Sequence, residues 1–206
     1  MRMLDLFSGL GGASEAFVQA GWDVLRLDND PLVADIPYTE MQNLSRFNDD
    51  PSSIIGIQMC QKEYPLDLVW ASPPCLDFTR GFAAPAPTAQ REGRDFEPDL
   101  NPLRTAKHLI DTINPDWWVI ENVSGASKIF SQELGMPPRQ IIGPYFLWGV
   151  FPRIAMDYSW ERPKGKCQDW NMDDPLRSTK RAKIPLEISQ KLLEAITQQR
   201  TLKDFP

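Results

Sequence analysis

Short apolar runs alternate with helix-like patterns over the first part of the chain. Residues 3–7 and 22–27 each form an apolar run of strand length, and the second run stops at a polar, Pro-containing stretch, residues 28–31. Between them, four apolar residues recur on one helical face: Ala13, Ala16, Phe17 and Ala20. We therefore predict a strand, a tight turn over residues 8–12, a helix and a second strand, with Gly21 ending the helix.

The same alternation continues further along the chain. Residues 66–71 and 117–120 are apolar runs that end in polar or Pro-bearing residues, as buried parallel strands do. Two helical faces are made of apolar residues at helical spacing, Leu103, Ala106, Ile110 and Ile113 in the first, and Ile188, Leu192 and Ile196 in a last helix over residues 185–197. Strands that alternate with helices predict an α/β fold, a doubly wound and mostly parallel sheet with helices on both faces.

Two segments lack such a pattern. Residues 76–102 hold four prolines and two glycines, and we predict a long loop here. Loops of this length in compact domains are usually functional or disordered. Residues 161–183 are irregular as well and carry seven basic side chains against four acidic ones. The length of the chain fits one domain over residues 1–206.

Composition narrows the class of protein. Of the 206 residues, 42% are hydrophobic and 24% are charged, which is typical of a globular protein. The formal net charge of −6 argues against a protein that holds nucleic acid mainly by bulk charge. No apolar stretch is long enough for a membrane helix, and the wide spacing of Cys60, Cys75 and Cys167 gives neither a disulfide framework nor a zinc site. We expect a cytoplasmic protein with no membrane partner and no metal.

The first predicted strand runs into a glycine-rich turn, made of Phe7, Ser8, Gly9, Leu10, Gly11 and Gly12. In α/β sheets, ligands bind beyond the carboxyl ends of the strands, and glycines let the backbone approach a cofactor closely. Asp28, at the end of the second strand and followed by Asn29, is placed to accept hydrogen bonds from a ribose. The alternatives are a tight turn without a ligand and a capping aspartate.

Two further strand ends carry reactive side chains. The third strand runs into Ser72, Pro73, Pro74 and Cys75, and the two prolines fix the backbone where the thiol is presented. Cys75 is a candidate nucleophile, and its alternative role is that of a small buried hydrophobic residue, which we expect of the other two cysteines. Glu121 ends an apolar strand at the same edge, where a carboxylate is costly unless it is used in chemistry or forms a structural salt bridge.

These segments together resemble the cytosine-C5 DNA methyltransferases. The resemblance rests on residues 5–12, on residues 72–75 and on residues 121–123, whose order and spacing match the family as well. It implies that the glycine turn binds S-adenosyl-L-methionine, that Cys75 attacks the cytosine and that Glu121 contacts the base. The implied cofactor-binding set is Phe7, Ser8, Gly9, Leu10, Gly11, Gly12, Asp28, Asn29, Asp35, Ile36, Ser72 and Pro73. Within it, Asp28 resembles the ribose-binding acid, and Asp35 with Ile36 resembles the element that meets adenine.

The implied reaction explains why these residue types occur together. C5 of cytosine is a poor nucleophile until a thiolate adds at C6, which is the role of Cys75. Glu121 would hydrogen-bond or protonate N3 of the base, and Arg153 would stabilise the carbonyl oxygen. The expected partner is double-stranded DNA, from which the target base must be flipped out of the stack.

Three departures from the family pattern affect the expected substrate. Leu76 stands where members usually have Gln, and residues 149–154 keep the family's arginine motif only in part, with Arg153 as the best remaining arginine or, alternatively, a surface residue. About 28 residues separate Arg153 from Ala182, where members insert a target-recognition domain. We therefore expect a minimal, phage-like member in which a short basic segment replaces that domain. Its specificity is then relaxed or supplied by a partner subunit.

Two other functions fit the same motifs. An RNA cytosine-C5 methyltransferase would use the same residues, because the motifs do not distinguish the two nucleic acids. A cofactor-binding protein that has lost catalysis would explain Leu76 and the incomplete arginine motif, but Cys75 and Glu121 are both intact. We predict that His108, the only histidine, has a structural role in the helix that contains Leu103 and Ile113.

Overall fold

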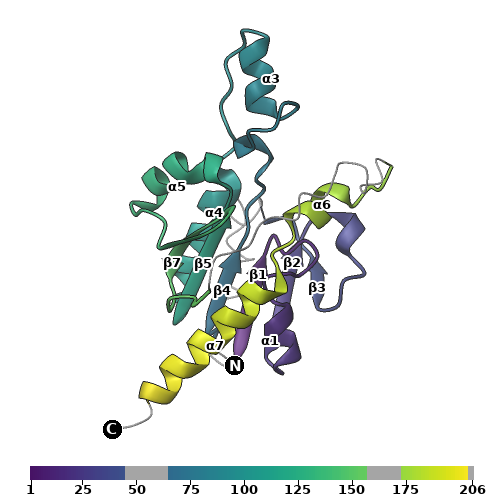
Figure 1. Ribbon diagram of the computed structural model, residues 1–206. Helices are drawn as coiled ribbons and strands as arrows, with labels where there is room; N and C mark the ends of the chain where they lie inside the picture. The colour runs from purple at the N-terminus through teal and green to yellow at the C-terminus, as the bar shows by residue number, and fades with distance from the viewer. Residues whose placement is uncertain (45–64, 157–172, 204–206) are drawn as a thin grey trace.

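The computed structural model describes residues 1–44, 65–156 and 173–203, and a seven-stranded sheet forms its centre (Figure 1). The strands are β1 (Arg2–Leu6), β2 (Asp23–Asp28), β3 (Thr39–Met41), β4 (Leu68–Ala71), β5 (Trp117–Asn122), β6 (Gln140–Ile142) and β7 (Tyr145–Val150). Their order across the sheet is β3-β2-β1-β4-β5-β7-β6. Strands β1 to β5 run parallel, and β7 lies antiparallel between β5 and β6. The predicted doubly wound, mostly parallel sheet is confirmed.

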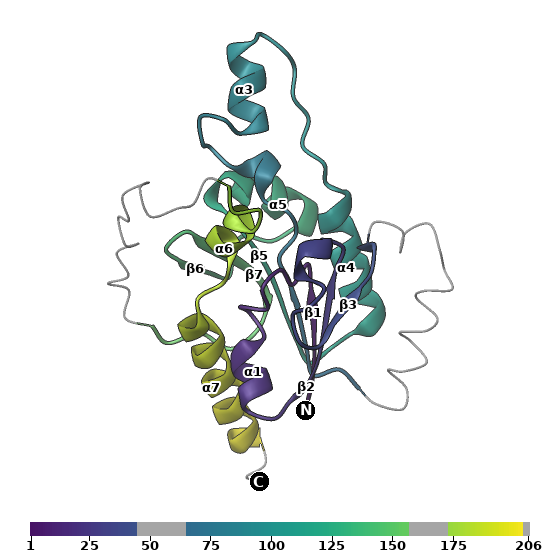
Figure 2. The same ribbon diagram turned by 90° about the vertical axis from the view of Figure 1, so that its right-hand side faces the viewer.

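Helices cover both faces of the sheet. They are α1 (Glu15–Gln19), α3 (Pro85–Arg91), α4 (Asn101–Ile113), α5 (Ser127–Leu134), α6 (Arg177–Ala182) and α7 (Leu186–Lys203), with short 3-10 turns η1 (Pro31–Val33), η3 (Leu76–Phe78) and η4 (Ser124–Ala126). Figures 1 and 2 show α1 and α7 on one face, and α4 and α5 on the other. Among the described residues, no helix is both long and apolar enough to cross a bilayer.

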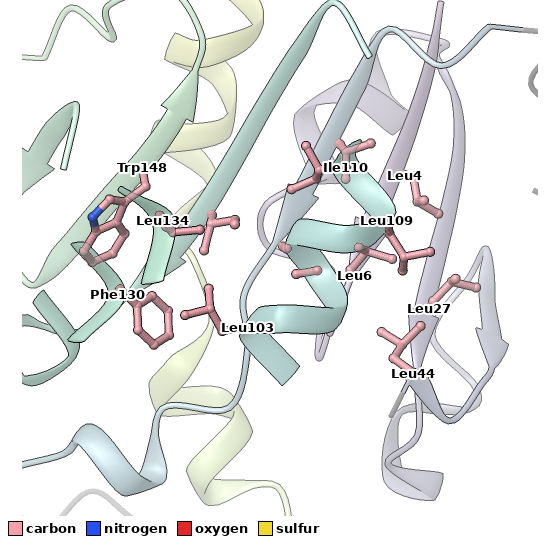
Figure 3. Close-up of a cluster of buried hydrophobic side chains, with 14 of the residues drawn as sticks. Leu4, Leu6, Leu27, Leu44, Leu103, Leu109, Ile110, Phe130, Leu134 and Trp148 are labelled. Atoms are coloured by element: carbon pink, nitrogen blue, oxygen red, sulfur yellow. The ribbon is translucent and has the colours of Figure 1, made fainter. Parts of the chain in front are cut away.

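Alternation along the strands divides the core between the two faces. Leu4 and Leu6 of β1 pack with α4 and α5, together with Phe130 and Trp148, as Figure 3 shows. Met3 directly precedes Leu4 in β1, so its side chain lies on the opposite face of the sheet. It belongs to a second cluster, which contains Phe17 of α1 and the apolar face of α7 made of Ile188, Leu192 and Ile196. Burying a side chain of this size contributes about 1.5–3 kcal/mol. The two clusters therefore hold the helices on both sides of the strands.

The predicted long loop is wrong in part, because the segment contains a helix. Helix α3 lies within it, and α4 begins at Asn101. The prolines do not prevent these helices, because Pro85 begins α3 and Pro102 lies in the first turn of α4. The first N–H groups of a helix have no partner within the helix, so proline is tolerated there.

Residues 79–100, called the arm below, project from the sheet. Figures 1 and 2 show α3 standing away from the rest of the molecule. The arm is closed at its base, where the Asp99 N–H donates to Asp77 Oδ2 at 2.9 Å. Inside the arm, the Arg91 guanidinium stacks 3.8 Å from the ring centroid of Phe82, which is otherwise exposed.

Other elements differ from the sequence prediction. The first helix is only five residues long, Glu15–Gln19, so Ala13 and Ala20 lie outside it. The hairpin of β6 and β7 was not predicted, nor were β3 and α5. The basic stretch is not irregular throughout, because α6 lies within it, whereas residues 161–172 are outside the described residues. The last helix is confirmed and extends further, to Lys203.

Candidate active site

Three strands end side by side at one edge of the sheet. Leu6 of β1 pairs with Ala71 of β4, and Ala71 pairs in turn with Ile120 of β5. Because the three strands are parallel, the segments that follow them leave the sheet at the same edge. The register thus brings together the glycine turn, the Pro-Cys segment and Glu121, as the sequence predicted.

Asn122 holds the Pro-Cys segment against β5. Its Nδ2 donates to the Pro73 carbonyl at 2.9 Å, and its Oδ1 accepts from the Val123 N–H at 2.9 Å. On the other side, the Ser72 N–H donates to the Leu6 carbonyl at 3.1 Å. The backbone before Cys75 is therefore fixed from both neighbouring strands.

Cys75 directly precedes the short η3 turn at this edge, as its N-cap residue, and is half-buried. The Thr79 hydroxyl donates to the Cys75 carbonyl at 2.9 Å. A Cβ at Gly125 would lie only 1.9 Å from the Phe78 carbonyl oxygen, so η3 can approach the backbone after β5 only because this residue is glycine. Burial, and then the charge of Glu121, raise the pKa of the Cys75 thiol, while a hydrogen bond with Thr79 opposes them.

Glu121 is 8% exposed and lies within electrostatic reach of Cys75. Burial raises the pKa of its carboxyl to about 7, and a hydrogen bond with the Ser72 side chain acts in the opposite direction. Ser72 Oγ also accepts a hydrogen bond from Trp70 Nε1 at 2.9 Å. A carboxyl that titrates near neutral pH can hold a proton for a base and release it again.

The glycine turn has an unusual backbone. Phe7, Gly9 and Gly11 all have positive φ, of 56°, 50° and 68°. Asp28 fixes the turn, because its Oδ2 accepts from the Gly9 N–H at 2.7 Å while its Oδ1 accepts from the Asp30 N–H at 2.9 Å. The aspartate therefore connects the end of β2 to the turn that follows β1.

Arg26 fills the space under this turn and is only 2% exposed. It donates to Ser14 Oγ at 2.8 Å, to the Gly11 carbonyl at 3.2 Å and to the Pro37 carbonyl at 3.0 Å. A Cβ at Gly11 would lie 2.3 Å from Arg26 Cζ. A second glycine, Gly12, is equally constrained, since its Cβ would lie 2.3 Å from the Ile184 carbonyl oxygen. The packing of the chain itself thus requires both glycines.

Asp5 lies beside Arg26 on the same face of the sheet and is buried. Its Oδ2 accepts from the Ser14 hydroxyl at 2.6 Å, and its Oδ1 has no hydrogen-bond partner among the described residues. Burial raises the pKa of Asp5 to about 7, against the hydrogen bond from Ser14 and the charge of Arg26.

The donors and acceptors around the turn fit a ligand that carries hydroxyl groups. The Ser8 hydroxyl is buried and has no hydrogen-bond partner among the described residues. Each oxygen of Asp28 accepts one backbone N–H, which leaves acceptor capacity on both. A nucleoside-bearing cofactor would satisfy both residues.

Asp35 and Ile36 lie on the connection between η1 and β3, before β3 begins, and Asp35 is exposed. The residues after β3 lie closer to Asp28, because the Gln42 N–H donates to the Asp28 carbonyl at 2.7 Å. Sequence reasoning missed β3, because three residues are too few for a recognisable pattern.

The structure does not bring Arg153 to Cys75 and Glu121. Along β7, Leu147 pairs with Glu121 and Val150 with Trp118, so the chain moves away from the carboxyl end of β5. Arg153 follows β7 as an exposed side chain. The next residue, Ile154, is fixed by hydrogen bonds of its carbonyl and N–H with the side chain of Gln140, at 2.7 and 2.9 Å. The predicted contact of Arg153 with the cytosine carbonyl therefore has no geometric support.

Comparisons with known proteins point to one family. Residues 1–133 match the family model described as C-5 cytosine-specific DNA methylase. The type II methyltransferase M.HgiDI of Herpetosiphon aurantiacus is 29% identical over 138 residues, 66% of this chain and 42% of that protein. M.HindV of Haemophilus influenzae is 28% identical over 128 residues, 62% and 39% of the two chains. The chain thus spans about two fifths of the length of these relatives.

A viral relative is matched over more of its length. The probable DNA (cytosine-5)-methyltransferase of Frog virus 3 is 28% identical over 165 residues, 76% of this chain and 69% of that protein. Among solved structures, a putative DNA modification methyltransferase encoded within an E. coli prophage has a TM-score of 0.47 and 20% identity, covering 73% of this chain and 46% of its own. S. pombe Dnmt2 has a TM-score of 0.43 and 19% identity, covering 66% and 38%.

Proposed function

We propose a function from one premise: the chain belongs to the C-5 cytosine-specific DNA methylase family, whose model matches residues 1–133. On that premise, the protein transfers a methyl group from S-adenosyl-L-methionine to C5 of cytosine in double-stranded DNA. One observation supports this activity above the others. A thiol, Cys75, and a buried carboxyl that titrates near neutral pH, Glu121, interact at the edge where the glycine turn also lies.

The first step needs both side chains. The Cys75 thiolate forms a bond to C6 of the cytosine, and the electron pair of the ring double bond becomes available at C5. N3 accepts a proton or a strong hydrogen bond from Glu121 as negative charge develops on the ring. The pKa of the Cys75 thiol is raised in part by the charge of Glu121. A protonated Glu121 therefore also favours the Cys75 thiolate.

When bound, S-adenosyl-L-methionine supplies an electrophilic methyl group on its sulfonium. The residues proposed to hold it are the predicted set, in which Ser8 and Asp28 have the free hydrogen-bonding capacity described above. After C5 has gained the methyl group, a water molecule takes the C5 proton, and the electron pair of that bond restores the C5–C6 double bond. The bond between Cys75 and C6 breaks with its electron pair returning to the thiolate, and N3 gives its proton back to Glu121. Arg153 has no part in this scheme.

The DNA must reach the same edge, and the target base must leave the stack to enter the site. The α6 segment is near this edge, because Thr179 Cγ2 would lie 3.4 Å from a Cβ on Gly9. Arg181 and Lys183 beside it are exposed. Phosphate contacts position DNA without reading its sequence, so sequence recognition is left to a partner subunit.

The test is methyl transfer from tritiated S-adenosyl-L-methionine to mixed-sequence duplex DNA and, separately, to transfer RNA. We expect label in DNA, recovered as 5-methylcytosine after digestion to nucleosides. Label in RNA alone would show that the substrate is RNA and that the same reaction takes place on it. With no label in either, DNA that contains 5-fluorocytosine tests for a single turnover, because fluorine at C5 blocks only the elimination that follows methyl transfer. A trapped Cys75 adduct would show that transfer occurs once but too slowly to accumulate label, as expected without a partner, and no adduct indicates a protein without this activity.

A further inference from the structure

We propose that Arg26 fixes the positions of two proposed cofactor-binding segments relative to each other, the glycine turn of residues 7–12 and the connection of residues 34–38. Arg26 is a positioning residue, because it lies buried under the turn and is not proposed to touch the cofactor. The inference rests on the proposed function, since it assumes that S-adenosyl-L-methionine contacts both segments.

The guanidinium of Arg26 joins separate parts of the chain. On one side, its Nη2 donates to the Gly11 carbonyl at 3.2 Å and to Glu15 Oε2 at 3.0 Å. Its Nε donates to Ser14 Oγ at 2.8 Å, just before α1. On the other side, its Nη1 donates to the Pro37 carbonyl at 3.0 Å. One rigid plane of atoms thus connects the glycine turn and the start of α1 to the connection that precedes β3.

The backbone of Arg26 holds the same connection. Its N–H donates to the Tyr38 carbonyl at 2.9 Å, and Arg26 pairs with Thr39 at the start of β3. Tyr38 has a φ of 67°, a strained value for a bulky residue that persists only where the surrounding contacts fix the backbone. The carbonyls of Pro37 and Tyr38 flank this torsion, and both accept from Arg26. Arg26 therefore stabilises the strained backbone next to residues 34–36.

Charge balance in the core is the competing explanation for Arg26. The guanidinium forms an ion pair with Glu15 at 3.0 Å and lies beside the buried carboxyl of Asp5. That role needs only a positive charge, which a lysine supplies as well. The connection between the segments needs more, because an ammonium is a point donor whereas a guanidinium donates in several fixed directions from one plane. Arg26→Lys therefore separates the two explanations.

The positioning role predicts a loss of affinity that depends on the ligand. On the proposed assignment, adenosine contacts Asp28 and the connection of residues 34–38, whereas the whole cofactor also contacts the glycine turn. When the two segments are no longer fixed relative to each other, a ligand that contacts both must order them on binding, which lowers its affinity. Adenosine avoids most of this cost.

The test is equilibrium dialysis of the protein with tritiated S-adenosyl-L-methionine and, separately, with tritiated adenosine. For Arg26→Lys we expect the Kd of the cofactor to rise about tenfold, as for the loss of one hydrogen bond to a charged group, and the Kd of adenosine to rise less than about twofold. Ser14→Ala is a second variant, in which Arg26 stays in place but its Nε loses its acceptor. It should weaken cofactor binding by less, with the same preference for the whole cofactor over adenosine.

Two control variants separate positioning from charge and from stability. Glu15→Gln removes the ion pair at the same guanidinium but keeps an oxygen acceptor, so neither Kd should change. Ile110→Val removes one buried methylene from α4, in the core cluster on the opposite face of the sheet. Thermal unfolding should show that Ile110→Val and Arg26→Lys are both destabilised, but only Arg26→Lys should bind the cofactor more weakly.

The proposal is overturned if Arg26→Lys leaves cofactor affinity unchanged, if it weakens both ligands equally, or if Glu15→Gln has the same effect. If Arg26→Lys does not fold, the first two criteria apply to Ser14→Ala. A wild-type protein that does not bind the cofactor would overturn the proposal and the proposed function together. A loss confined to the cofactor, in a protein that methylates no nucleic acid, would support the positioning role and reject the proposed function. An active enzyme in which Arg26→Lys binds the cofactor normally would do the reverse.

Discussion

Two turns lie together at the carboxyl ends of the parallel strands, and different interactions determine them. The glycine turn after β1 is determined by contacts within the chain, with Arg26 under Gly11 and Ile184 over Gly12. The turn after β4 instead places a thiol beside a buried carboxyl, Glu121, which has no ion-pair partner among the described residues.

The difference separates evidence for packing from evidence for chemistry. Glycines at Gly11 and Gly12 would be needed even if no cofactor were bound, so their presence alone does not indicate a ligand. Burying Glu121 raises its pKa and destabilises its charged form, and no ion pair among the described residues compensates for that cost. We therefore expect changes at the second turn to affect activity and changes at the first to affect mainly stability.

Cys75→Ala should give the largest effect and tests the second turn directly. Loss of the nucleophile should reduce methyl transfer by a factor on the order of 10⁴ or more. Affinity for S-adenosyl-L-methionine, measured by calorimetry, should stay nearly unchanged because the thiol is not proposed to contact the cofactor. Equal loss of both quantities would show that Cys75 supports the fold of the site instead.

Gly11→Ala tests whether packing under the first turn needs this glycine, with Gly21→Ala as its control. Both glycines have positive φ, 68° and 78°, but a Cβ at Gly21 would meet no atom within 4 Å. The backbone penalty of about 1–2 kcal/mol is common to both variants, and crowding of Arg26 should add about 1–3 kcal/mol at Gly11 alone. Urea denaturation measures the difference, and equal destabilisation would mean that Arg26 moves aside freely.

Asp28→Ala asks whether the first turn also binds the cofactor. Removing a charged acceptor should weaken S-adenosyl-L-methionine binding by about 10- to 100-fold. Asp30→Ala is the control, because Asp30 accepts from the Leu32 N–H and caps η1. Calorimetry that finds the same affinity for wild type and Asp28→Ala would remove Asp28 from the proposed cofactor site.

Asp5→Asn concerns the pH dependence of stability. The pKa of Asp5 is raised from 3.8 to about 7 in the folded protein, so the folded state binds the proton more tightly. Its contribution is complete below pH 3.8 and is lost as the pH rises towards 7, with a slope of at most about 1.4 kcal/mol per pH unit. Denaturation at several pH values should show this slope reduced in Asp5→Asn. An unchanged slope would assign it to Glu121.

The sequence predicted the parts of the molecule that strong patterns specify. Apolar runs of strand length gave β1, β2, β4 and β5, and the order of parallel strands then brought Cys75 and Glu121 to one edge. Helices α4 and α7 were predicted because each has a complete apolar face over three or more turns. A pattern that repeats over several turns is not obscured by one or two residues that depart from it, which explains why these two helices could be predicted.

What the sequence missed depends on contacts between distant residues. The β6–β7 hairpin reverses direction beside β5, so Arg153 leaves the site although its motif resembles the family's. Arg26 had a signal, since a charged residue within the apolar run of β2 is costly to bury unless it is paired. The same physical argument identifies Glu121 in β5.

The base of the arm makes that part of the molecule an exchangeable module. The chain departs after η3 and returns at α4, and the Asp99 N–H donates to Asp77 where the two ends meet. We expect that sequence within the arm can be lengthened, shortened or replaced without altering the order of the strands or the register that aligns Cys75 with Glu121. Changes in the arm are in this way separated from the position of the proposed nucleophile.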